Sequence, residues 1–170
     1  KSDHKNYLKE NFSGIDYNLI VNTSRGSMAR SLSYLDEESD SISHENNFVE
    51  CLRFAFLAKK SKAAILDLTK WSEKLASISR DQQKDFLSYC SYLIREAMLI
   101  SYSSKNLGSF SSNTDFKIDK LSPFVHSSNL IEIISLIEEC HYSISRNVNS
   151  KIVFTNFAIT LTKLINKEEV

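Results

Sequence analysis

Two stretches near the end of the chain decide the fold: residues 127–145, SSNLIEIISLIEECHYSIS, and residues 150–165, SKIVFTNFAITLTKLI. In the first stretch the large aliphatic residues recur every three or four positions, which is the spacing of one face of an α-helix. These residues are Leu130, Ile133, Ile134, Ile137 and Ile144. The pattern predicts an amphipathic helix over residues 127–145.

The second stretch is apolar around more than one face of a helix. One apolar stripe consists of Ile152, Val153, Phe157, Leu161, Leu164 and Ile165. Three further apolar residues broaden this stripe: Phe154, Ala158 and Ile159. The opening residues 152–155 also have strand propensity, but the length of the stretch favours a helix. A helix that is apolar most of the way round is typical of the centre of a bundle or of a surface shared with another subunit.

The same helical spacing extends towards the N-terminus, through residues 48–56, 64–78 and 86–100. Helix start signals agree with it. Ser79 with Gln82 three residues later fits a capping box, and Asn129 with Glu132 fits the same template. We therefore expect a succession of helices with short connections, and Pro123 in a turn before the helix at 127–145.

Composition favours the same fold class. The 170 residues include 3 Gly and 1 Pro, whereas average usage gives roughly a dozen and eight. A β-sandwich or barrel needs many turns with positive φ, for which this chain lacks the glycines. Together with the periodicity, this predicts an all-α helical bundle.

Charge and hydropathy bound the function and location. Lys plus Arg and Asp plus Glu are both 21, so the basic surplus typical of nucleic-acid-binding domains is missing. No apolar run is long enough to span a membrane, and no signal peptide is evident. The odd, widely spaced Cys51, Cys90 and Cys140 lie in apolar runs, which is typical of buried reduced thiols. We expect a cytoplasmic protein without a membrane partner.

The chain is expected to divide in an acidic, polar segment at residues 36–44 that reads as a linker or an exposed connection. Three short helical stretches, roughly 3–11, 15–24 and 27–36, precede it. A serine-rich segment at 103–116 is expected to form a long, mobile loop. This predicts one unit over residues 1–42 and a helical domain over residues 43–170.

Catalytic and cofactor motifs are missing from the sequence. No glycine is followed by the lysine of a phosphate-binding loop, and there is no Cys-x-x-Cys pair. Cys140 and His141 are the only adjacent Cys and His, and neighbours on a helix point in different directions. We predict no catalytic residue, no metal, no cofactor and no small-molecule substrate. A small enzyme that uses Cys140 and His141 is an alternative that needs an accessible, perturbed thiol.

One polar segment, Arg146-Asn147-Val148-Asn149, joins the two most apolar helices. Arg and Asn between buried helices usually satisfy helix ends by hydrogen bonding. The alternative is an intersubunit contact, since Arg is enriched at protein interfaces. Both roles can hold, and Arg146, Asn147 and Asn149 are the candidate interface residues.

Residues 144–157 resemble the last helical hairpin of bacterial clamp-loader subunits, in particular the delta-prime subunits of DNA polymerase III, which show a similar Arg-Asn-x-Asn segment followed by an apolar helix. Residues 71–75, 81–97 and 121–124 look like that family too. Upstream, residues 25–32 resemble the glycine-led helix of an AAA+ lid. There Ala29 holds the position at which ATP-binding members often carry the sensor Arg, and Arg30 follows it.

The resemblance implies a C-terminal fragment: part of an AAA+ lid over residues 1–42, then a collar domain over residues 43–170, with the ATPase-like module upstream. It implies a non-catalytic replisome subunit whose collar assembles with loader subunits of the gamma/tau and delta type. Contact with the sliding clamp and primed DNA would be indirect. A helical DNA-binding or regulatory domain is the alternative, although no helix here concentrates Lys and Arg.

Overall fold

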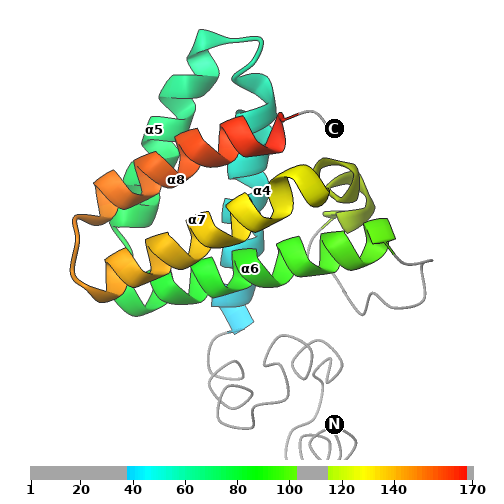
Figure 1. The fold of residues 1–170 in the computed structure, drawn as a ribbon. Helices are drawn as coiled ribbons and strands as arrows, with labels where there is room; N and C mark the ends of the chain where they lie inside the picture. Colours follow the sequence, from blue (N-terminus) through cyan, green and yellow to red (C-terminus); the bar gives the residue numbers. More distant parts are fainter. Residues whose placement is uncertain (1–37, 103–114, 168–170) are drawn as a thin grey trace, which may run out of the picture.

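The computed structural model describes residues 38–102 and 115–167, and in these two ranges every regular element is helical (Figure 1). The predicted all-α bundle is confirmed. The elements are α4 (Glu38–Leu57), α5 (Lys62–Ala76), α6 (Arg80–Tyr102), the 3₁₀ turns η1 (Ile118–Lys120) and η2 (Ser122–Phe124), α7 (Ser127–Ser145) and α8 (Ser150–Ile165). Pro123 lies in η2, as predicted, and α7 and α8 have the predicted bounds.

Helices α6, α7 and α8 run side by side with alternating directions, and α4 crosses behind them (Figure 1). Helix α5 packs against both α4 and α8. Helix α8 therefore touches α4, α5 and α7, which explains why its sequence is apolar around most of its circumference.

The centre of the core is an aromatic cluster contributed by three helices. Trp71 of α5 lies about 6 Å, between ring centroids, from Phe86 of α6 and from Phe154 and Phe157 of α8. All four side chains are buried. The Trp71 indole N–H donates to the Asn47 carbonyl at 2.8 Å, so its one polar group is satisfied. Rings from α5, α6 and α8 thus fix these helices on one another.

Local start signals account for one helix end and miss another. The predicted capping box is present at α6, where the Ser79 N–H donates to Gln82 Oε1 and the Gln82 N–H donates to Ser79 Oγ. The predicted cap at Asn129 with Glu132 is wrong. Helix α7 starts at Ser127, directly after the cap residue His126. Asn129 is its third residue, and the His126 N–H donates to Asn129 Oδ1 at 3.0 Å.

The predicted linker is wrong for residues 38–44, which form the start of α4. The segment contains no glycine or proline, so nothing in it interrupts a helical backbone. The helices predicted before residue 37, and most of the loop predicted at 103–116, lie outside the described residues. The division at residue 42 therefore stays a prediction.

Polar side chains at the start of α4 are buried, which the sequence did not indicate. His44 is buried within α4 at the rings of Phe86 and Tyr89. Beside it, Tyr89 Oη donates to Glu45 Oε2 at 2.8 Å. Burial and the neighbouring Glu45 carboxylate raise the pKa of Tyr89, which keeps the phenol protonated and able to donate.

Candidate protein-interaction surfaces

The turn between α7 and α8 brings the three candidate residues Arg146, Asn147 and Asn149 to one exposed corner of the bundle. Asn149 caps α8, because its Oδ1 accepts from the N–H groups of Lys151 at 3.0 Å and Ile152 at 3.4 Å. This is the helix-end role that the sequence left open as one of two alternatives.

Asn147 ends α7 by adopting the left-handed backbone conformation, with φ of 62°. The Asn147 N–H donates to the Ile144 carbonyl, and the Val148 N–H reaches back to the Ser143 carbonyl. This pair of bonds is a Schellman motif, in which glycine is usual and asparagine is tolerated. The backbone of Asn147 thus also serves the fold.

Arg146 differs from the two asparagines because its side chain remains exposed. Its guanidinium carbon lies 5.9 Å from the centroid of the Tyr142 ring, one turn earlier on α7. Both side chains are exposed, and Tyr142 is 65% accessible. A stacked arginine and tyrosine at a corner form a preorganised polar and aromatic pair of the kind enriched in protein interfaces.

The turn is also fixed from a distance by Arg80, which no sequence pattern singled out. Arg80 Nη1 donates to the carbonyls of Ile144 and Val148, each at 3.2 Å, and Nη2 donates to the Asn147 carbonyl at 3.5 Å. No short-range pattern links residue 80 to residues 144–148. The sequence shows an arginine beside the capping box, but it does not show which carbonyls this arginine binds.

Gln83 makes a second link to the same corner, from inside the protein. Its side-chain amide donates to the carbonyls of Leu75, Ala76 and Ile78 at the end of α5, at 3.1, 3.4 and 2.9 Å. Its Oε1 accepts from Ser150 Oγ at 2.8 Å at the start of α8. One amide that is 1% exposed therefore joins the ends of three helices.

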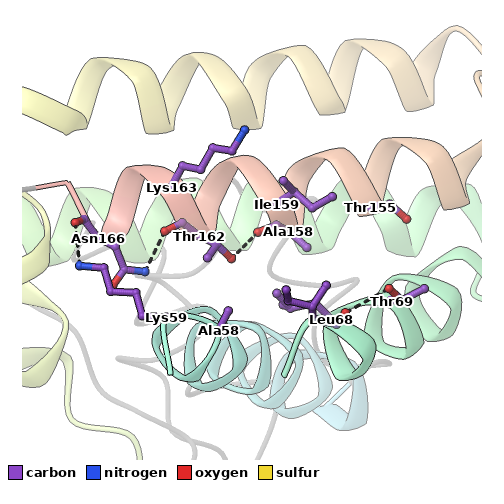
Figure 2. Close-up of a pocket in the computed structure, with 11 residues that line it drawn as sticks. Ala58, Lys59, Leu68, Thr69, Thr155, Ala158, Ile159, Thr162, Lys163 and Asn166 are labelled. Carbon is purple, nitrogen blue, oxygen red and sulfur yellow. Dashed lines mark hydrogen bonds between the residues drawn. The ribbon is translucent and has the colours of Figure 1, made fainter. Parts of the chain in front are cut away.

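A groove of about 550 Å³ lies between α8 and the corner formed by α4 and α5 (Figure 2). We call it the α5–α8 groove. Its floor contains Leu68 and Ala158, which are buried, and its two rims carry Ile65 of α5 and Ile159 of α8, which are 52% and 45% exposed. The remaining lining residues are Ala58, Lys59, Thr69, Thr155, Thr162, Lys163 and Asn166.

Polar contacts close the α5–α8 groove at both ends. At one end Ser72 Oγ and Thr155 Oγ1 are 2.9 Å apart, and Lys151 pairs with Glu73 at 2.7 Å. At the other end, Lys59 Nζ donates to the Asn166 carbonyl at 3.3 Å, and Asn166 Nδ2 donates to the Ala55 carbonyl. Lys59 therefore sits where α4 and α8 both end, as expected for a cation that complements helix dipoles.

The three cysteines are buried and free, as predicted. Burial, with the nearby Glu139 carboxylate, raises the pKa of Cys140 to about 12, and burial also raises those of Cys51 and Cys90. An activated thiol needs the opposite shift. Within residues 38–102 and 115–167, no three His, Cys, Asp or Glu side chains are grouped to hold a metal ion.

None of the helices in the described part of the chain combines the length and the apolarity needed to cross a bilayer. Comparisons with family models, with curated proteins and with solved structures give no match to this chain.

Proposed function

We propose that this chain is a helical assembly domain that joins other protein subunits through the corner at the α7–α8 turn. The single observation that carries the proposal is the exposed Arg146–Tyr142 pair, flanked by two further exposed apolar side chains, Val148 and Ile152. Exposed apolar side chains gathered beside an arginine are typical of a surface that a partner covers.

The resemblance of residues 144–157 to clamp-loader subunits gives this proposal its specific form. In that form the domain is a collar that packs against loader subunits of the gamma/tau and delta type. It holds the ATPase modules in order while the sliding clamp is loaded on DNA. An all-α bundle with an exposed apolar and arginine-bearing corner suits such a joint, which needs no nucleophile and no metal.

Co-purification with loader subunits from the same organism, followed by light scattering for mass, tests the proposal. We expect a stable hetero-oligomer. The collar form would be contradicted if the chain stayed monomeric and did not bind these subunits, both alone and together with any natural upstream sequence. Saturable binding of duplex DNA in their place would favour the alternative, a helical DNA-binding or regulatory domain.

The Arg146→Ala variant tests the corner itself. The Arg146 side chain is exposed, and the interaction found for it among the described residues is the one with the Tyr142 ring. We therefore expect the free energy of unfolding to change by less than about 0.5 kcal/mol. Subunit affinity should fall about tenfold, as for a central interface arginine. Arg53→Ala, an exposed arginine on α4, is the matched control and should affect neither quantity. Equal losses of stability and assembly would make Arg146 a helix-end residue only.

A further inference from the structure

The α5–α8 groove is apolar because the threonine hydroxyls and the Asn166 amide N–H group that line it already have partners within the chain. Thr69 Oγ1 donates to the Ile65 carbonyl and Thr162 Oγ1 donates to the Ala158 carbonyl, which leaves each methyl group available for contact. Asn166 Nδ2 donates to the Thr162 carbonyl (Figure 2). It also donates to the Ala55 carbonyl. An occupant would therefore gain by burying apolar side chains rather than by hydrogen bonding to the lining.

The apolar surface continues beyond the groove along α8. Ile152 precedes the rim residue Ile159 by seven residues, which places both on one face of the helix, and Ile152 is 65% exposed. A small ligand seated between Leu68 and Ala158 would leave this row uncovered. A helix laid along α8 would cover both the groove and the row, which is the arrangement of amphipathic helices in apolar grooves.

Charge differs between the two ends of the groove. At the Thr155 end, the only charged pair described above, Lys151 and Glu73, is neutral overall. At the Asn166 end, Lys62 lies one turn before the rim residue Ile65, and Lys163 lies one turn after the rim residue Ile159. Among the residues that the structure describes, neither lysine forms an ion pair, and nor does the nearby Lys60. Lys62 and Lys163 therefore lie on the two sides of the groove, and neither is paired with an acidic side chain among the described residues.

We infer that the α5–α8 groove binds an amphipathic helix of a partner protein. Its apolar side chains fill the space over Leu68 and Ala158, and its acidic residues lie between Lys62 and Lys163. The row along α8 reaches the α7–α8 corner at Ile152, but the groove itself and its lysines lie away from that corner. The groove therefore gives the domain a second docking site that does not depend on the proposed collar role.

A synthetic peptide tests the inference with the whole 170-residue chain. The probe is a fluorescein-labelled helix of about 18 residues, long enough to be partly helical in water. It carries leucines one and two turns apart on one face and three glutamates in its first turn. A matched peptide carries lysines in place of the glutamates. By fluorescence anisotropy, we expect the glutamate peptide to bind with a Kd in the micromolar range, about tenfold or more tighter than the lysine peptide.

Variants locate the binding site. We expect Ile159→Asp to weaken the glutamate peptide about tenfold, since it places a charge on the apolar rim. Ile131→Asp, on the exposed face of α7, is the matched control and should change nothing. The double variant Lys62→Glu with Lys163→Glu should reverse the preference towards the lysine peptide. Arg146→Ala should leave peptide binding unchanged. Thermal unfolding followed by circular dichroism confirms that each variant is folded.

Several results would overturn the inference. These are equal affinity for the two peptides, no saturable binding of the glutamate peptide, or equal losses in the Ile159→Asp and Ile131→Asp variants. A further contrary result involves decanoate, a small anionic amphiphile. The inference would be overturned if decanoate bound, if the Ile159→Asp variant weakened that binding, and if the glutamate peptide did not bind. That outcome would assign the groove to a small ligand.

Discussion

The two candidate surfaces lie along the same helix, α8, yet they are built in opposite ways. At the α7–α8 turn, side chains from distant parts of the chain bind the exposed backbone: Arg80 reaches three carbonyls, and Gln83 joins Ser150 to the end of α5. In the α5–α8 groove the hydroxyls of Thr69 and Thr162 bond within their own helices, and isoleucines face solvent. The first region is completed by the chain itself, whereas the second leaves apolar surface that a partner can bury.

Because of this difference, substitutions at the turn should change the stability of the fold, whereas substitutions in the groove should change partner binding. Removing a long-range polar contact at the turn leaves carbonyl or hydroxyl groups without their partner, which costs free energy of folding. Changing a half-exposed isoleucine in the groove removes little that the folded monomer uses. Substitutions in the two regions should therefore affect different measurements.

Gln83→Ala is expected to have the largest effect. The variant leaves three carbonyls at the end of α5 and the Ser150 hydroxyl without their partner in a buried site. We expect the free energy of unfolding to fall by about 3 kcal/mol. Urea denaturation measures it, and Asp85→Ala, an exposed position on the same helix, should stay within about 0.5 kcal/mol of the parent. A small loss for Gln83→Ala would mean that water replaces these bonds.

Arg80→Ala should cost less, about 2 kcal/mol, because its guanidinium is only partly withdrawn from water. Arg80→Lys should recover only part of the loss, since one ammonium cannot match the fork that reaches Ile144, Asn147 and Val148. Urea denaturation again provides the comparison. Full recovery by lysine would show that charge alone, and not the geometry of the fork, fixes the turn.

These residues show what sequence reasoning could reach. Helical spacing predicted the buried faces, because contacts such as those of Phe48, Trp71 and Phe86 follow from a fixed period. The capping box at Ser79 was predictable since both partners lie within four residues. Arg80 donates to carbonyls more than sixty residues away, and Gln83 donates to carbonyls up to eight residues away. Every residue has a backbone carbonyl, so the sequence does not mark which one accepts the bond.

The mistaken predictions also arise from contacts between residues that are far apart in the sequence. Glu132 was assigned to a cap with Asn129, but it pairs with Lys167 at 2.6 Å, 35 residues away. The polar residues at 38–44 gave no periodic signal, yet helix α4 includes them and buries His44. The groove could not be predicted either. Ile159 was counted with the apolar faces of α8, and only packing decides which apolar residue is left outside.

The core beneath both regions can be tested through Cys140 on α7. The pKa of this thiol is raised from 9.0 to about 12 in the folded protein. The thiol of the unfolded chain ionises first as pH rises, so the contribution of Cys140 to stability is complete below pH 9 and is lost between pH 9 and about 12. At pH 10 the loss from Cys140 should be about 1 kcal/mol. Urea denaturation at pH 7 and pH 10 measures the loss, and Cys140→Ala should reduce it by that amount. An unchanged pH dependence in the variant would mean that the thiol is reached by water.

Asn147 provides the smallest and most specific test of the turn. Its φ of 62° is a conformation that glycine adopts without a steric penalty, and its side chain is exposed. We expect Asn147→Gly to raise the free energy of unfolding by up to about 0.5 kcal/mol, or to leave it unchanged. Asn147→Ala should lower it by about 1 kcal/mol, because a Cβ without a compensating polar group disfavours positive φ. Equal stability of the two variants would mean that the turn tolerates another backbone conformation. The Arg80 bonds to the neighbouring carbonyls would then set the corner, and the Schellman motif would follow from them.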